Sequence, residues 1–157
     1  MSDNAKRNAK AHAETIEALY DLHCWDGTRE AAVDLEPEAV ELAGEFGWDY
    51  ACPDVHALQD WIETRAREIP LSVLVRSDWH VPGDESEAGS GDFELLLTTG
   101  GPGCRITGCL HQGEPSHREG ERPDSQWQDW GEPWTVSDYR VSSDALLWFC
   151  CLFYFGA

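Results

Sequence analysis

The chain has 157 residues, of which 41% are hydrophobic, and this suits one domain with a buried core rather than a disordered chain. It carries 30 Asp and Glu residues against 11 Lys and Arg, which gives a formal net charge of −19. Repulsion at this charge argues against direct binding to nucleic acid or to anionic membranes, and it favours basic protein surfaces as partners.

Two further features bear on where the protein works. No run approaches the roughly 18 consecutive apolar residues that a membrane-spanning helix needs. Residues 1–15 lack the apolar segment of a secretory signal. We therefore expect a cytoplasmic protein without a membrane span.

The acidity has a second explanation that needs no partner. In hosts that live at high salt, a large net charge keeps proteins soluble. Only two of the cationic residues are lysines, Lys6 and Lys10, and the others are arginines, which fits such a host as well as it fits a dedicated binding function. Both explanations remain open on the sequence alone.

Residues 1–10 are polar and basic, and we expect them to be frayed, whereas residues 11–70 are predicted to be helical. The first helix has apolar residues at the spacing i, i+3, i+4 and i+7, and Gly27 ends it. Its apolar face is formed by Ile16, Leu19, Tyr20 and His23.

A second helix is predicted to end at Gly47 and to have Pro37 in its first turn. Its apolar side is formed by Val40, Ala43 and Phe46. Its outer side is acidic and consists of Glu36, Glu38, Glu41 and Glu45.

A third helix begins after Asp54, whose carboxylate can cap the first turn, and Pro70 closes it. Its apolar stripe is formed by Val55, Leu58, Ile62, Ala66 and Ile69. Asp60 and Glu63 are expected on the outer side of this helix.

After Pro70 the hydrophobic period changes from that of a helix to that of a strand. Strands are predicted at residues 71–77, 92–99 and 104–111, and residues 125–130 are a candidate fourth strand. The first strand is expected to have a half-buried face formed by Leu71, Val73 and Val75. The loop after it is acidic and contains Asp84, Glu85 and Glu87.

The last segment, from about residue 142, is apolar nearly all round, which is typical of a buried helix. The predicted fold class is therefore α+β, as a single domain over residues 1–157. It has N-terminal helices, an antiparallel meander sheet of three or four strands, and a C-terminal buried helix.

No group of residues singles out an enzyme. Cys104, Cys109 and His111 are of the types that bind zinc, but the two cysteines should point to opposite faces of a strand. Cys150 and Cys151 lie in the apolar last segment and are expected to be small core residues. The GGPG turn lacks the residues of a phosphate-binding loop. We predict no catalytic residue, metal or cofactor, and a small enzyme or zinc protein is the remaining alternative.

The stretch WQDWGEPWT places Trp127, Trp130 and Trp134 beside the acids Asp129 and Glu132. If they are exposed, Trp130 and Trp134 would anchor a protein interface or hold a cationic group by cation–π contact. If they pack on the sheet, the same side chains would stabilise a turn. The sequence leaves both interpretations open.

The acids of the helices and loops can form a dense array of carboxylates. Duplex DNA carries one charge per ~1.7 Å of its axis, so a protein that displays carboxylates densely can occupy a basic nucleic-acid-binding groove. The candidate partner-binding residues are Glu36, Glu38, Glu41, Glu45, Asp60, Glu63, Asp84, Glu85, Glu87, Asp129, Trp130, Glu132 and Trp134. A solvated acidic surface without a partner is the competing interpretation.

Residues 92–156 contain the strings FELLLTTGGPGCRITGCL, QGEP, WQDWGEPWT and LLWFCCLFYFG. With these strings the segment resembles a family of small uncharacterised proteins from phages, plasmids and integrated elements of proteobacteria. The resemblance is interrupted by the polar insertion 116–125, which departs from the family pattern. It implies a mobile-element setting, where small acidic proteins often inhibit host defence. The expected function is thus that of a non-enzymatic antidefence protein, which mimics nucleic acid and binds a basic site of a CRISPR or restriction complex.

Overall fold

The computed structural model describes residues 2–48, 54–77, 82, 91–99, 103–129, 132–136 and 143–155 of the chain. The described helices are α1 (Ser2–Cys24), α2 (Arg29–Ala32), α3 (Pro37–Phe46), α4 (Val55–Arg67) and α5 (Ser143–Cys151). The described strands are β1 (Ser72–Ser77), β2 (Gly91–Thr98), β3 (Gly103–His111), β4 (Glu114–Pro115), β5 (Asp124–Gln128) and β6 (Thr135–Val136). The fold is α+β, as predicted from the sequence.

The first helix is longer than the sequence pattern predicts. α1 begins at Ser2, so the expectation that residues 1–10 are frayed is wrong. Ala5 and Ala9 are fully buried, because this end of α1 lies along β5 and β3 of the sheet. Alanine side chains let the helix approach closely and favour the helical state, yet they give only a weak hydrophobic signal.

The helices α3 and α4 begin and end where the sequence predicts. Asp54 caps α4, since its carboxylate accepts a hydrogen bond of 3.0 Å from the backbone N–H of Ala57. Gly47 closes α3 with a φ of 104°, a left-handed conformation that favours glycine. The predicted apolar face of α3 is partly wrong: Ala39 and Ala43 are buried, and Val40 is exposed. The buried face of α3 is the one that contacts α1.

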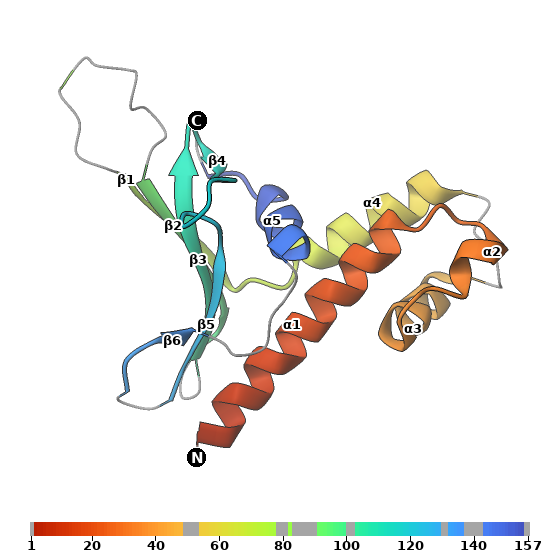
Figure 1. Cartoon of the computed structure of the whole chain (residues 1–157), viewed down its shortest axis with the longest axis horizontal. Helices are drawn as coiled ribbons and strands as arrows, with labels where there is room; N and C mark the ends of the chain where they lie inside the picture. The colour runs from red at the N-terminus through yellow and green to blue at the C-terminus, as the bar shows by residue number, and fades with distance from the viewer. Residues whose placement is uncertain are drawn as a thin grey trace.

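The strands form one antiparallel sheet in the order β1-β2-β3-β5-β6, with β4 paired to β3. The predicted fourth strand is therefore present as β5, and two short strands extend the meander. α5 lies between the sheet and α1, while α2 and α3 lie at the far end of the molecule from the sheet (Figure 1). The core contains Phe93, Leu95 and Ile106 from the sheet and Phe149 from α5.

The first strand differs from the prediction of a half-buried face. Leu71, Val73 and Val75 are all exposed, and so is Leu74 on the opposite face. The reason is that β1 is an edge strand, and the helices α1 and α5 pack against β3, β4 and β5 instead. Among the described residues, no helix combines the length and the hydropathy needed to cross a lipid bilayer.

Candidate protein-binding groove between α1 and α3

The helices α1 and α3 pack side by side and carry carboxylates at the same spacing. On α1 these are Glu14, Glu17 and Asp21, and on α3 they are Glu38, Glu41 and Glu45. Both sets follow the pattern i, i+3 and i+7, which places each set along one side of its helix. Two rows of acids therefore flank the line of contact, and we call this region the acidic groove.

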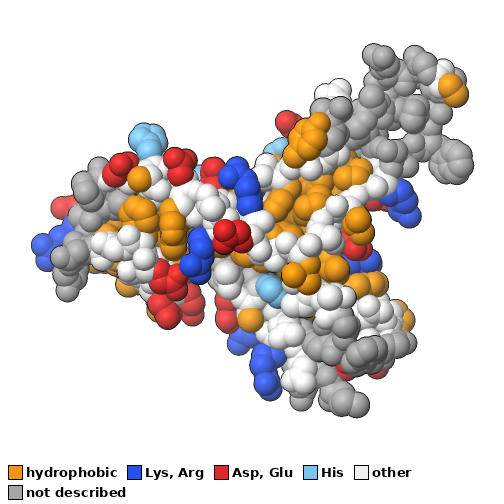
Figure 2. Space-filling view, turned by 180° about the vertical axis from the view of Figure 1, so that it is seen from behind, with side chains coloured by type: hydrophobic (Ala, Val, Ile, Leu, Met, Phe, Trp, Pro, Cys, Tyr) orange, Lys and Arg blue, Asp and Glu red, His pale blue; other side chains and the backbone are white. Residues whose placement is uncertain are grey.

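Two hollows lie along the acidic groove. The first, of about 490 Å³, is lined by Glu14, Glu17, Asp21, Glu36 and Glu38 together with Ala18, Tyr20 and Cys24. The second, of about 300 Å³, is lined by Glu14, Glu38, Glu41 and Glu45 together with small and apolar residues. No lysine or arginine lines either hollow. Asp and Glu side chains gather over this helical end of the molecule (Figure 2).

Three contacts hold parts of the acidic groove in place. The Asp21 carboxylate accepts a 3.0 Å hydrogen bond from the backbone N–H of Glu36. Arg65 pairs with Glu45 at 2.8 Å, which joins α4 to α3. Lys10 lies 3.7 Å from Glu14 on the same helix. All the paired side chains are roughly half exposed, so these ion pairs add little stability, but each cation offsets the charge of one groove carboxylate.

Four of the predicted binding residues line the acidic groove: Glu36, Glu38, Glu41 and Glu45. Glu38 and Glu41 are exposed and make no ion pair with any described residue. Asp60 is exposed on α4 but does not line either hollow. The residues that the sequence argument missed are Glu14, Glu17 and Asp21, although their spacing matches that of the acids on α3.

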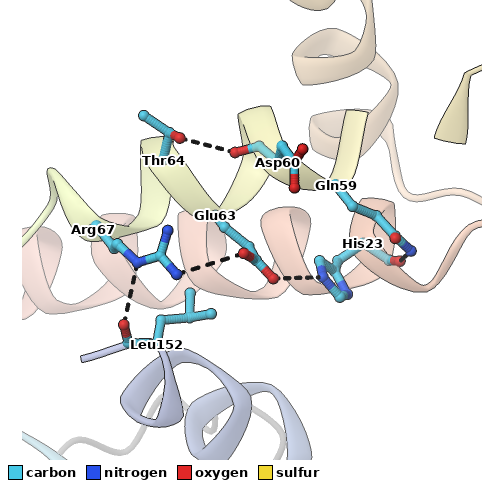
Figure 3. Close-up of polar contacts among 7 residues, drawn as sticks. All are labelled: His23, Gln59, Asp60, Glu63, Thr64, Arg67 and Leu152. Carbon is cyan, nitrogen blue, oxygen red and sulfur yellow. Dashed lines mark hydrogen bonds and ion pairs between the residues drawn. The ribbon is translucent and has the colours of Figure 1, made fainter. Parts of the chain in front are cut away.

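Glu63 has a different role from the one expected. It is only about 31% exposed, and its two carboxylate oxygens lie 3.5 Å from His23 Nε2 and 3.5 Å from Arg67 Nη2. Arg67 also donates a 3.2 Å hydrogen bond from Nε to the carbonyl of Leu152 (Figure 3). The prediction that Glu63 faces outward is therefore wrong: it joins α4 to α1 and, through Arg67, to the end of α5.

Trp127 lies in β5 and packs against the core, with Lys6 Nζ of α1 5.6 Å from its ring centroid, while Glu132 and Trp134 lie between β5 and β6. Trp134 is half-buried, and the Arg105 guanidinium lies 4.1 Å from its ring centroid. Arg105 also pairs with Glu94 at 2.7 Å and donates a 2.9 Å hydrogen bond to Gln126. Trp134 thus packs on the solvent side of the sheet rather than standing free.

The remaining predicted positions fall into two groups. Asp129 is half-buried and Glu132 is exposed, but neither lines the acidic groove. Asp84, Glu85, Glu87 and Trp130 lie outside the described residues.

Cys104 and Cys109 occupy the positions that the strand pattern predicts, and Cys150 is buried as expected, but Cys151 is exposed, so the prediction that it is a core residue is wrong. Cys104 is buried on the inner face of β3, and Cys109 lies on the other face. Burial raises the pKa of Cys104 to about 11, and burial also raises the pKa of Cys150 well above its usual value. Within the described ranges, no three His, Cys, Asp or Glu side chains are grouped so as to hold a metal ion.

Comparisons of the chain with models of protein families, with curated proteins and with solved structures found no match. A groove with many carboxylates and no lining cation attracts lysine and arginine side chains, which can form charge-assisted hydrogen bonds with it.

Proposed function

We propose that the protein is a non-enzymatic antidefence protein of a mobile genetic element. In this proposal the acidic groove occupies a basic nucleic-acid-binding site on a host defence complex of the CRISPR or restriction type. The observation that carries the proposal is the pair of matched carboxylate rows on α1 and α3, with no cation in the lining between them.

The spacing of carboxylates along the acidic groove is comparable to the spacing of phosphates along DNA. Residues i and i+7 of a helix are separated by ~10.5 Å along the axis. Duplex DNA carries about six phosphate charges over that length. The two rows supply six carboxylates over the same length: Glu14, Glu17, Asp21, Glu38, Glu41 and Glu45. Two of them, Glu14 and Glu45, are paired with Lys10 and Arg65 at the margin of the groove. A surface that binds phosphates with arginine and lysine can therefore find a similar number of anionic partners here.

The resemblance of residues 92–156 to proteins of phages and plasmids supports the proposed origin in a mobile element. It does not bear on which residues bind the partner. A basic channel that normally grips a phosphate backbone is the natural partner for an acidic surface. Long-range attraction would speed the encounter, and salt would weaken it. The partner is thus expected to be a protein complex and not nucleic acid itself.

The experiment is a pull-down of restriction and CRISPR complexes at low and high salt, together with phage plating on cells that carry the defence system. The test variant reverses the charge of Glu38, Glu41 and Glu45 to lysine. The matched control reverses Glu68, Glu119 and Asp124, which are also exposed but do not line the acidic groove. We expect the first variant alone to lose binding and protection of the phage. Failure of the unmodified protein to bind at low salt, with no effect on plating, would reject the proposal.

A second candidate function is favoured by acids that lie outside the acidic groove, such as Glu119, Asp124 and Glu132. They are consistent with an acidic accessory protein adapted to a high-salt host, without a nucleic-acid-mimicking role. In that case the melting temperature should rise steadily between low and molar salt, as ions screen self-repulsion. A melting temperature that does not change with salt, or a host whose other proteins are near neutral, would count against this candidate.

A further inference from the structure

The edge strand β1 exposes apolar side chains on both faces of the sheet. Leu71 is 61% exposed, Val73 38%, Leu74 56% and Val75 45%. β1 ends the strand order, so among the described residues no strand pairs with its outer edge. In the view from behind, hydrophobic side chains gather over the sheet (Figure 2). The backbone N–H and C=O groups of such an edge can pair with another strand, and the apolar side chains beside them can pack against it.

Proteins usually protect such an edge with lysine, proline, a bulge or a charged residue. From Ser72 to Val75, β1 has none of these residue types, and its pairing with β2 is regular. The one charge on the strand, Arg76, pairs with Asp92 of β2. In a chain with a net charge of −19, residues 69–77 contain no acid at all. The edge is therefore the place where a second, equally acidic chain meets the least repulsion.

The sequence of β1 is self-complementary. In an antiparallel pair of identical strands, a two-fold axis at Leu74 places Leu74 opposite its own copy. The same register places Val73 opposite Val75 and Ser72 opposite Arg76. Apolar residues then face apolar residues on each side of the sheet, and such cross-strand pairs are stabilising. The two Arg76 residues lie ~14 Å apart in this register, beyond the Debye length at physiological salt.

We propose that β1 pairs with β1 of a second copy of this chain, in antiparallel register centred on Leu74, and joins the two sheets into one. A six-residue strand is ~20 Å long, so the contact buries on the order of 400 Å² from each copy. Stable dimers bury more than this, so the dimer is weak and forms at high protein concentration. This inference does not rest on the proposed function of the acidic groove.

The test is sedimentation velocity of the full chain at protein concentrations from about 10 μM to 1 mM, the range of weak complexes. It is done at about 0.1 M and about 1 M salt, between which the Debye length falls from ~10 to ~3 Å. We expect a monomer–dimer equilibrium whose dissociation constant falls at least about threefold at the higher salt, because repulsion between the acidic copies is screened. Binding of a basic partner should weaken with salt, so the two proposals can fail separately.

Two variants locate the interface. Leu74→Lys places like charges on the two-fold axis and should weaken the dimer by at least about tenfold. Val136→Lys is the matched control, because Val136 is 54% exposed and lies on the same face of the sheet at its opposite edge. A mixture of Leu74→Lys and Leu74→Glu chains should dimerise better than either variant alone. Circular dichroism of each variant checks that the fold is retained.

Three outcomes would overturn the inference. The first is an unmodified chain that stays monomeric over the whole concentration range at both salts. The second is a Leu74→Lys variant that dimerises as well as Val136→Lys. The third is a mixture of the Lys and Glu variants that is no tighter than each alone, because the register requires Leu74 to face its own copy.

Discussion

The Asp21 carboxylate on α1 accepts a hydrogen bond from the backbone N–H of Glu36, with 3.0 Å between the two atoms, where α3 begins. This contact joins the two walls of the acidic groove across 15 residues of sequence. It also places a negative charge at the N-terminus of α3, which the helix dipole favours. Asp21 thus stabilises the contact between α1 and α3, and its charge also adds to the negative field of the groove.

Removal of this carboxylate should destabilise the protein. We expect Asp21→Ala to lower the free energy of unfolding by about 1 kcal/mol, since a backbone N–H at the start of a helix loses its acceptor. Asp21→Asn keeps an acceptor oxygen and should lose less than half of that amount. Urea unfolding of the two variants measures the difference. Equal losses in both would show that the hydrogen bond is not what joins the helices.

Arg105 should be the most sensitive polar residue of the sheet. It contacts the Trp134 ring, Glu94 and Gln126 at the same time, and its side chain is only about 23% exposed. Arg105→Lys keeps the charge but loses the stacking and one of the hydrogen bonds, and we expect a loss of about 1–2 kcal/mol in unfolding free energy. A double-mutant cycle with Glu94→Gln separates the ion pair from the stacking. A loss below 0.3 kcal/mol, roughly the additivity error, would contradict this assignment.

Two glycines should respond oppositely to the same substitution. A Cβ at Gly108 would lie 2.7 Å from a Phe93 ring carbon and 3.2 Å from the Pro123 Cα, so Gly108→Ala should destabilise by about 1–3 kcal/mol. A Cβ at Gly44, inside α3, meets no atom within 4 Å. Gly44→Ala should therefore stabilise by about 0.5–1 kcal/mol through helix propensity. Thermal unfolding of both variants tests the packing of the sheet and of α3 together.

Alkaline pH should weaken the fold through its buried thiols. Burial raises the pKa of Cys104 from 9.0 to about 11, so the folded state holds this proton more tightly than the unfolded chain does. The stabilisation is complete below pH 9 and is lost as pH rises towards 11, by up to about 2–3 kcal/mol. Raised pKa values of Cys150 and Tyr20 act in the same direction. A Cys104→Ala variant should lose stability less steeply between pH 9 and 11; an unchanged slope would count against Cys104.

Much of the fold can be predicted from local sequence patterns. The wrong predictions concern properties that depend on contacts between distant elements. Asp54 and the stripe of α4 were predicted correctly, because capping and helical periodicity are properties of neighbouring residues. The exposure of Val40 and of Val75 depends on which other elements lie against α3 and β1, and no local pattern contains that information.

The candidate site was predicted in part for the same reason. The acids of α3 were identified from their place on the helix surface, and they do line the acidic groove. Glu14, Glu17 and Asp21 were missed because their importance comes from the packing of α1 against α3. Glu63 was placed outside because the sequence does not reveal that His23 and Arg67 lie beside it.

The most direct test of the central claim is competition with nucleic acid for a host defence complex. The complex that the protein captures is mixed with labelled nucleic acid and increasing amounts of the unmodified chain, or of the variant with lysine at positions 38, 41 and 45. We predict that the unmodified chain displaces the nucleic acid, less effectively as salt rises, and that the variant does not. Simultaneous binding of protein and nucleic acid, or equal displacement by the variant, would contradict the account.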